Sequence, residues 1–460
     1  MRVIICGAGQ VGSTIARHLA SEGIDVTVID NSPLQARRVD ESYDVRGIVG
    51  HASHPKTLEQ AGAHDADMLI AVTRYDEVNM VACQIAYSLF NVRRRIARIR
   101  HHGYLEPLWK KLYAVDQLPI DVIISPEFEV ATSIARRLKA PGAFDMTTLA
   151  EHRIQLLGIH CRSRDCPVVN RPLSDLPEIM PEQPVTVIAI IREGRAFVPT
   201  ENDRIQPGDD VYVITDPLFV DGIMAAFGHS EQIARRIIII GGGNVGLHLA
   251  RLLGKSNLVS LKIIESQRER ADFISQALGD SAVVLCGDAL DADLLREARI
   301  AAAETVVAVT NDDETNIFAS MLAKRVGCQR AIALVNKASY EPMLPALGID
   351  AVINPSTITI STILRHVRHS PVTTLYTLRE DFGDVIETTA QEGSRLVRGK
   401  LREARLPQGM LVAAILRDGE LIIPNPDSQV QPGDRIIAVI AHKALRKAEA
   451  ILAGTAARTA

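Results

Sequence analysis

Two glycine-rich stretches in this sequence have the residue types and the spacing that bind phosphate groups. The first runs from Gly7 to Gly12 and the second from Gly241 to Gly246, and each reads Gly-x-Gly-x-x-Gly after an apolar run. In this pattern the first glycine permits a tight strand-to-helix turn, the second lets a pyrophosphate approach bare backbone, and the third lets the helix pack closely on the strand. The phosphates then lie at the helix N-terminus, where free N–H groups favour negative charge.

Each glycine stretch is followed by a second apolar run that ends in an acid. Asp30 lies 18 residues past Gly12, and Glu265 lies 19 residues past Gly246. A carboxylate at the tip of the second strand accepts hydrogen bonds from ribose hydroxyls. Because the same combination occurs twice, the sequence predicts two sites for an adenine nucleotide such as NAD(H).

Further polar residues follow the other apolar runs, where ligands of open parallel sheets bind. They include His51 after the third run, Arg74 after the fourth and Arg98 and Arg100 near the fifth. The complete set of predicted cofactor-binding residues is Gly7, Ala8, Gly9, Gln10, Val11, Gly12, Asp30, Thr73, Arg74, Arg98, Gly241, Gly242, Gly243, Asn244, Val245, Gly246, Glu265, Asp288, Thr310 and Asn311.

The residue types around the two stretches favour binding over catalysis. Hydride transfer needs a positioned proton donor beside the nicotinamide, usually His, Lys or Tyr. His51 and His54 are candidates, but no paired group would orient them, and we interpret them as polar loop residues. Asp30 would repel a 2′-phosphate, which disfavours NADP despite Arg37 and Arg38. We therefore predict that the protein is not an enzyme.

The elements that must position these residues alternate between strand and helix. Helical spacing of apolar residues over 75–90, and the cap Asn31-Ser32-Pro33, indicate helices between the apolar runs. Such alternation predicts an α/β fold with a doubly wound parallel sheet. The predicted strands are Val3–Cys6, Val26–Asp30, Arg46–Gly50, Met68–Thr73, Ile96–Arg100 and Val122–Ser125.

A different pattern of short apolar runs, prolines and glycines follows, and then the whole arrangement repeats. We predict a hairpin over 199–215, with Gln206-Pro207-Gly208-Asp209 as a type II turn that Gln431-Pro432-Gly433-Asp434 repeats. An offset near 230 residues indicates an internal duplication. The predicted organisation is two Rossmann-like nucleotide-binding domains, 1–140 and 234–357, each followed by a small α+β module, 143–228 and 372–453.

Composition narrows the classes of partner. The formal net charge of −4 leaves no basic footprint for nucleic acid, and we interpret Arg93-Arg94-Arg95 as a solvated segment or subunit contact. No apolar run approaches the roughly 18 residues of a spanning helix, and we expect no signal peptide. Of six cysteines, we expect most, including Cys6 and Cys286, to be small core residues; Cys161 and Cys166 lack a zinc-site spacing, so no metal is predicted.

This duplicated arrangement resembles the tandem RCK (KTN) family, and most closely the peripheral cytoplasmic subunit of the Trk potassium transporter. The resemblance covers nearly the whole chain and rests on the two glycine stretches, Asp30 and Glu265, the two Pro-Gly-Asp turns, and Thr73, Asp76 and Asn79 with Thr310 and Asn316. It implies domains that bind NAD(H) or ATP/ADP and pair through the helices after the sixth strand. It also implies a homo-oligomeric ring, expected to be a tetramer, that docks on the cytoplasmic face of the inner membrane beneath a pore subunit.

Two positions depart from the family pattern. Gly50 is followed by His51, whereas Gly287 is followed by the more usual Asp288, and the second copy has Ala333 and Leu334 where the first has Arg98. We therefore expect the first site to tolerate more phosphate charge than the second. The resemblance implies a regulatory subunit that gates or activates a potassium transporter in response to nucleotides. The alternative is an NAD-dependent dehydrogenase with a duplicated Rossmann unit.

Overall fold

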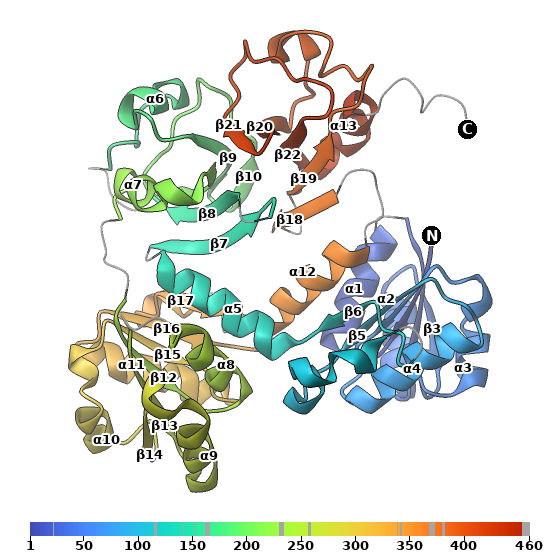
Figure 1. Cartoon of the computed structure of the whole chain (residues 1–460), viewed down its shortest axis with the longest axis vertical. Helices are drawn as coiled ribbons and strands as arrows, with labels where there is room; N and C mark the ends of the chain where they lie inside the picture. Colours follow the sequence, from blue (N-terminus) through green and yellow to red (C-terminus); the bar gives the residue numbers. More distant parts are fainter. Residues whose placement is uncertain are drawn as a thin grey trace. The chain divides into compact units, whose positions relative to one another are not determined.

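The chain folds as two compact units, each built from parts of both sequence copies. The computed structural model describes residues 1–21, 23–114, 117–140, 142–151, 153–161, 166–229, 234–255, 259–337, 339–340, 343–367, 373–379 and 382–452. One unit comprises 1–134 and 235–367, and the other comprises 135–234 and 368–460 (Figure 1). The predicted module limits at 372 and 453 lie outside the described residues.

The first half of the first unit is a six-stranded sheet in the order β3-β2-β1-β4-β5-β6, with every pair parallel. This is the doubly wound order of dinucleotide-binding domains. The strands are β1 (Arg2–Cys6), β2 (Asp25–Asp30), β3 (Arg46–Val49), β4 (Met68–Ala71), β5 (Arg94–Arg98) and β6 (Val122–Ile124). The helices are α1 (Gln10–Ser21), α2 (Pro33–Ser42), α3 (Pro55–Gln60), α4 (Asp76–Ser88) and α5 (Pro126–Lys139).

The second half repeats this sheet as β14-β13-β12-β15-β16-β17, again all parallel. The strands are β12 (Arg236–Ile240), β13 (Ser260–Glu265), β14 (Val283–Cys286), β15 (Thr305–Ala308), β16 (Arg330–Leu334) and β17 (Ala351–Ile353). The helices are α8 (Asn244–Leu253), α9 (Arg268–Leu278), α10 (Ala292–Glu297), α11 (Asp313–Val326) and α12 (Pro355–Val367). The predicted α/β fold and its duplication are confirmed.

The central strands are apolar at nearly every position because each contributes to two hydrophobic cores, one on each face of the sheet. Val3 and Ile5 of β1 belong to one hydrophobic cluster, and Ile4 and Cys6 belong to the cluster on the opposite face of the sheet. Successive side chains of a strand point to opposite faces, so a strand covered by helices on both sides must be apolar at every position.

The helix after the sixth strand of each copy contacts the other copy. Ile360, Ile363, Leu364 and Val367 of α12 join the core cluster of the first sheet, where α12 lies beside α1 (Figure 1). On α5, Phe128 contacts the ring of His248 on α8, with ring centroids 6.0 Å apart. The two halves therefore share their hydrophobic packing.

The second unit contains two five-stranded antiparallel sheets, β10-β9-β11-β8-β7 and β18-β19-β22-β20-β21. Leu156 and Ile214 of the first module share one hydrophobic cluster with Val385 and Val439 of the second. The strands are β7 (Ala143–Leu149), β8 (Ile154–His160), β9 (Val185–Arg192), β10 (Arg195–Phe197), β11 (Asp210–Thr215), β18 (Thr373–Arg379), β19 (Gly383–Thr389), β20 (Met410–Arg417), β21 (Glu420–Ile422) and β22 (Arg435–Ala441). The helices are α6 (Leu176–Ile179), α7 (Val220–Ala226) and α13 (Leu445–Leu452).

The hairpin predicted over 199–215 is wrong, although its turn is right. The strands β10 and β11 both pair with β9 and therefore do not pair with each other. The turn at 206–209 has Gly208 at φ +93° and a hydrogen bond from Asp209 N–H to the Gln206 carbonyl, as a type II turn requires.

The two Pro-Gly-Asp turns are fastened in the same way. Asp209 forms two hydrogen bonds with Arg192, at 2.9 and 2.8 Å, and Asp434 forms two with Arg417 at the same distances. Both carboxylates are buried. Each arginine lies 17 residues before its aspartate, outside the Pro-Gly-Asp motif, so the motif alone does not predict this contact.

The structure corrects the expectations for Cys286 and for Arg95. Cys6 is buried as predicted, but Cys286 is exposed because β14 is an edge strand. Arg95 is not solvated: it lies buried in β5 and forms an ion pair with Asp121 at 2.8 Å.

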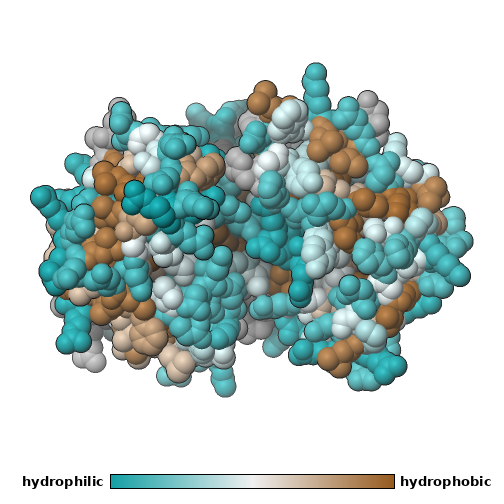
Figure 2. All heavy atoms as spheres, turned by 90° about the horizontal axis from the view of Figure 1, so that it is seen from below, coloured by the Kyte–Doolittle hydropathy of each residue, from teal (hydrophilic) through white to brown (hydrophobic). Residues whose placement is uncertain are grey.

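None of the helices in the described part of the chain is long and apolar enough to cross a membrane. Figure 2 shows hydrophobic side chains on one face in separate groups among hydrophilic ones.

Candidate nucleotide site

Both glycine loops have the backbone that phosphate binding requires. Gly7 has φ +108°, in the left-handed region that favours glycine, and a Cβ on Gly12 would lie 1.8 Å from the Gly7 carbonyl oxygen. A Cβ on Gly9 would have no atom of the described residues within 4 Å, so space remains beside the start of α1. The second loop is equivalent: φ is +100° at Gly241, Gly246 would clash at 2.0 Å, and Gly243 is open.

The acid at the tip of each second strand is fastened to its glycine loop. Asp30 Oδ2 accepts the Ala8 N–H at 2.7 Å, and Oδ1 accepts the Ser32 N–H at 2.8 Å. Glu265 repeats the arrangement with the N–H groups of Gly242 at 2.8 Å and Gln267 at 2.9 Å. A carboxylate oxygen has two lone pairs, so each acid retains acceptors for ribose hydroxyls.

A buried asparagine fixes the segments after the fourth and fifth strands. Asn79 is fully buried; its Oδ1 accepts from the Thr73 N–H and hydroxyl, at 2.9 and 2.7 Å, and its Nδ2 donates to the carbonyls of Thr73 and Arg98. The same four bonds join Asn316 to Thr310 and Leu334. The threonine hydroxyls are therefore engaged in positioning the loop.

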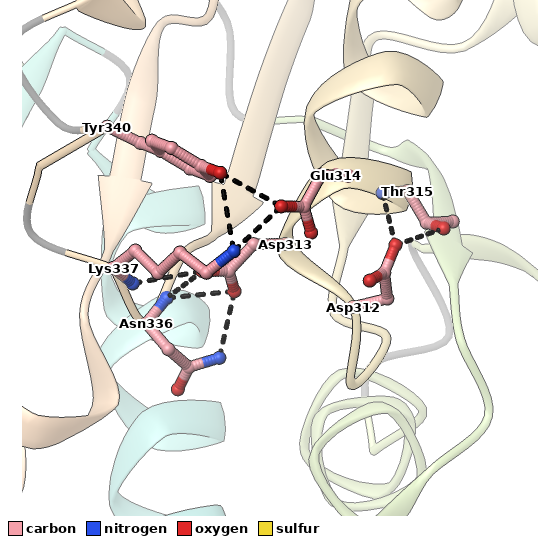
Figure 3. A network of polar contacts seen from close by, with 7 residues as sticks. All are labelled: Asp312, Asp313, Glu314, Thr315, Asn336, Lys337 and Tyr340. Carbon is pink, nitrogen blue, oxygen red and sulfur yellow. Dashed lines mark hydrogen bonds and ion pairs between the residues drawn. The ribbon is translucent and has the colours of Figure 1, made fainter.

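The first residue of the following helix holds the next segment. Asp313 accepts hydrogen bonds from the backbone N–H groups of Asn336 and Lys337 and from Asn336 Nδ2 (Figure 3). In the first half, Asp76 accepts from the N–H groups of Arg100 and His101. These bonds fix the direction of the chain beyond β5 and β16, where the cleft residues Arg98 and Leu334 lie.

An exposed ion pair lies beside this contact in the second half. Lys337 Nζ bonds to Glu314 Oε1 at 2.8 Å, and the Tyr340 hydroxyl donates to the same oxygen at 2.9 Å (Figure 3). The hydrogen bond from Lys337 lowers the pKa of Glu314 to about 2 and raises the pKa of Lys337. Both side chains are about half exposed, so water screens the pair.

A single cleft of about 940 Å³ connects the two glycine loops. Its lining from the first half includes the glycine loop, Asp30 and His51, and its lining from the second half includes Gly243, Asn244 and Thr310. The N-termini of α5 and α12 also contribute, through Pro126, Glu127, Pro355, Ser356 and Thr359. The volume is at the upper end of the range for ligand sites.

Arg98 lines the cleft with a guanidinium nitrogen that is buried and unsatisfied among the described residues. Its Nε is buried and has no hydrogen-bond partner in the described part of the chain. Burial, followed by the charge of neighbouring Arg100, lowers the pKa of Arg98. Arg100 itself is paired with Glu127 at 2.8 Å. A guanidinium placed in this way favours binding of an anion.

The cleft collects most but not all of the predicted residues. Of the predicted set, it is lined by Gly7, Gly9, Gln10, Val11, Gly12, Asp30, Thr73, Arg74, Arg98, Gly243, Asn244, Val245, Thr310 and Asn311. Ala8, Gly241, Gly242, Gly246 and Glu265 are not among the lining residues; they lie in the two glycine loops, in α8 and at the end of β13. Asp288 is exposed, and its carboxylate accepts the Leu290 N–H at 2.9 Å.

Sequence reasoning missed one arginine. Arg270 lines the cleft from the first turn of α9, and its Nε donates to the Gly242 carbonyl at 2.8 Å. Its counterpart in the first half is Gln35, which lines the cleft as well. Its position in the sequence could have indicated it, because Arg270 lies five residues after Glu265, as Gln35 lies five residues after Asp30.

Solved structures of similar fold cover nearly the whole chain. The crystal structure of the GsuK RCK domain has a TM-score of 0.60 at 21% identity and covers 97% of this chain and 93% of that chain. The GsuK channel bound to NAD has a TM-score of 0.61 at 19% identity, covering 98% and 78%. At this identity the similarity establishes the RCK fold.

Sequence relatives are closer. The TrkA-N domain model matches residues 3–126 and 237–355, and the TrkA-C domain model matches 163–226 and 385–453. The chain is 45% identical over 438 residues to the Trk system potassium uptake protein TrkA of Azorhizobium caulinodans, covering 95% of each protein. It is 37% identical to the protein of that name from Vibrio alginolyticus, covering 96% of each. The chain therefore belongs to the TrkA family of Trk system potassium uptake proteins, as a tandem pair of TrkA-N and TrkA-C domains.

Proposed function

We propose that this chain is a nucleotide-binding regulatory subunit that gates or activates a membrane potassium transporter in response to NAD(H), ATP or ADP. The relatives named as potassium uptake proteins support the transport role. Two glycine loops that open on one cleft support the nucleotide role. The chain acts without catalysing a reaction, as a homo-oligomeric ring on the cytoplasmic face of the membrane, docked on a pore subunit.

The observation that carries the nucleotide role is the combination of open glycines and an unsatisfied cation. Gly9 and Gly243 leave space beside the N-termini of α1 and α8, where backbone N–H groups attract phosphate. Arg98 Nε lies buried in the same cleft and has no acceptor among the residues that the structure describes. An anion with a ribose, held between the glycine loop and Asp30, supplies the acceptor and uses both features.

Regulation follows from the position of the cleft between the two halves. A nucleotide that spans the cleft contacts residues of both halves, because the lining comes from both. A ligand shifts a conformational equilibrium only by its difference in affinity for the two states. Nucleotides that place different phosphate charges near Arg98 differ in their affinity for the two conformational states. Exchange of one nucleotide for another therefore changes the state of the ring.

The binding test compares matched glycine variants. Gly9→Val fills the open space of the first loop, and Gly243→Val fills that of the second, without the clash expected at the third glycine. Titration calorimetry with NADH, NAD, ATP and ADP should give two sites per chain in the native protein and one in each variant. A ligand present at 100 times its Kd should stabilise the native state by about 2.7 kcal/mol. Unchanged stoichiometry in both variants contradicts the assignment.

The transport test uses cells that lack the gene. Uptake at low external potassium should be restored by the native chain and not by the double variant Gly9→Val/Gly243→Val, provided both proteins accumulate equally. Restoration by the double variant separates transport from nucleotide binding and refutes the regulatory role. An NADH absorbance assay with purified protein checks the absence of turnover.

A further inference from the structure

Arg270 holds its guanidinium at the mouth of the second glycine loop. Its Nε donates to the Gly242 carbonyl at 2.8 Å, and its Nη2 donates to Asn244 Oδ1 at 3.4 Å. The guanidinium carbon lies 5.1 Å from the ring centroid of Phe273, one turn further along α9. These contacts place a positive charge next to the open position of Gly243.

The hydrogen bonds of Arg270 leave most of its donors unused. A guanidinium has five N–H donors, and its two hydrogen bonds to residues that the structure describes go to neutral acceptors. The remaining N–H groups can bind phosphate oxygens, and hydrogen bonds to an anion are about twice as strong as those between neutral groups. The planar fork also suits the paired oxygens of a phosphate.

The two halves place their cleft arginines on different elements. The first half has Arg98 at the end of β5 and Gln35 in the first turn of α2. The second half has Leu334 at the end of β16 and Arg270 in the first turn of α9. The equivalence of Arg98 and Leu334 is structural, because their carbonyls accept from Asn79 and Asn316, respectively.

We propose that Arg270 binds the pyrophosphate of the nucleotide in the second loop, so that this site recognises the diphosphate that ADP and NAD share. This inference rests on the proposed function and specifies the ligand group of its second site. The sequence led us to expect less phosphate charge at the second site, because the second copy has Leu334 where the first has Arg98. The second site is instead cationic on the side of the glycine loop.

A structural role for Arg270 predicts a different result from a phosphate contact. Because the glycine loop itself receives phosphate, a loop that Arg270 only maintained would also lose ADP more than adenosine, but its ADP affinity would keep the same salt dependence. A direct contact between the guanidinium and phosphate makes the ADP affinity fall more steeply with salt, and Arg270→Lys, which keeps the charge, recovers part of that affinity. Salt dependence and the lysine variant therefore separate the two roles, while adenosine reports binding that needs no phosphate.

The test uses Gly9→Val as the background, so that only the second site binds. Titration of ADP and adenosine into Arg270→Gln, which introduces the residue of the first half, should weaken ADP by about tenfold to a hundredfold and adenosine by less than about threefold. Arg270→Lys keeps the charge and loses the fork, so it should recover part of the ADP affinity. The ADP affinity of the background protein should also fall with salt more steeply than that of Arg270→Gln.

The reciprocal variant provides a gain of binding. In a Gly243→Val background, Gln35→Arg should increase the affinity of the first site for ADP by several-fold.

Equal ADP affinity of the background protein and Arg270→Gln, in variants with unchanged circular dichroism and melting temperature, overturns the inference. If the Gly9→Val protein binds no nucleotide while Gly243→Val binds one, the second loop is not a site at all. That outcome contradicts the proposed function at this loop, independently of Arg270.

Discussion

Asp30 Oδ2 accepts the backbone N–H of Ala8 at 2.7 Å, which makes the acid part of the glycine loop before any ligand arrives. Its other oxygen accepts from Ser32. Glu265 does the same with Gly242 and Gln267, although its side chain is one methylene longer. The acid therefore has two roles, because it shapes the loop that receives phosphate and retains acceptors for the ribose.

Replacing Asp30 by alanine should loosen the first loop and leave the second intact. Two N–H groups lose their acceptor, which costs about 1–3 kcal/mol locally if water does not replace it. Hydrogen exchange of peptides containing Ala8 and Ser32 should become faster, while that of the 237–246 peptide should not change. Nucleotide stoichiometry should fall to one per chain. Unaltered protection around Ala8 would show that the carboxylate does not hold the loop.

Asn79→Ala should be among the more destabilising substitutions in the first sheet. It leaves the N–H and carbonyl of Thr73 and the carbonyl of Arg98 without their partner in a buried setting. We expect a loss of about 3 kcal/mol, measured by urea unfolding. Thr73→Val is the matched control: it removes only the hydroxyl, and should cost about 1 kcal/mol. Equal effects of the two variants would argue against a central role for the amide.

Gly12→Ala and Gly9→Ala should differ sharply despite being the same chemical change. The methyl group on Gly12 would lie 1.8 Å from the Gly7 carbonyl oxygen, which forces α1 away from β1. We expect at least about 3 kcal/mol of destabilisation there, and within about 0.5 kcal/mol at Gly9, where the methyl enters open space. Melting temperatures of the two variants check this. Similar melting temperatures would mean that helix and strand are less closely packed than the structure shows.

The Asp434–Arg417 pair should give the second small module a measurable dependence on acid. Burial raises the pKa of Asp434, but hydrogen bonds from Arg417 and the Gln431 N–H outweigh burial, so this pKa lies below its ordinary value. A depressed pKa stabilises the fold above the pKa of the unfolded chain, near 3.9, and that contribution is lost as the pH falls through the folded value.

Asp434→Ala should therefore cost about 2 kcal/mol at pH 7, and the difference from the native chain should shrink below about pH 4. Asp427→Ala is the control, because Asp427 pairs with Lys400 on the surface, where water screens the pair, and it should cost much less than Asp434→Ala. Urea denaturation at several pH values measures both. A constant Asp434 effect down to pH 2 would exclude the carboxylate charge as its cause.

The parallel sheets were predictable because their determinants are local and repeated. A glycine loop between an apolar run and a helix, with an acid at the next strand end, specifies a strand–helix–strand unit. The pairing of β10 with β9 was not predictable in this way, since the alternation of apolar residues does not select a partner strand. Arg95 was misjudged for the same reason: its burial depends on Asp121 and on the Pro119 carbonyl, which come from a distant segment.

The sequence predicted the backbone of the candidate site, but only some of the side chains that line it. Gly9 and Asp30 follow from the motif, because spacing alone determines where they lie. Arg270 reaches the second loop from a helix that the motif does not include. The contribution of Pro126 and Pro355 arises only when the two halves come together, which a reading of each copy by itself does not contain.

The packing of α12 on the first sheet has a consequence for biosynthesis. The cluster around Val3 and Ile5 is completed by Ile360 and Ile363, which emerge from the ribosome after roughly 230 further residues beyond β6. At roughly 5–20 residues per second, the nascent first sheet waits roughly 10–50 s with part of its apolar surface uncovered. That interval makes the emerging chain a client for holding chaperones, and a stop codon between the copies would leave a product prone to aggregation.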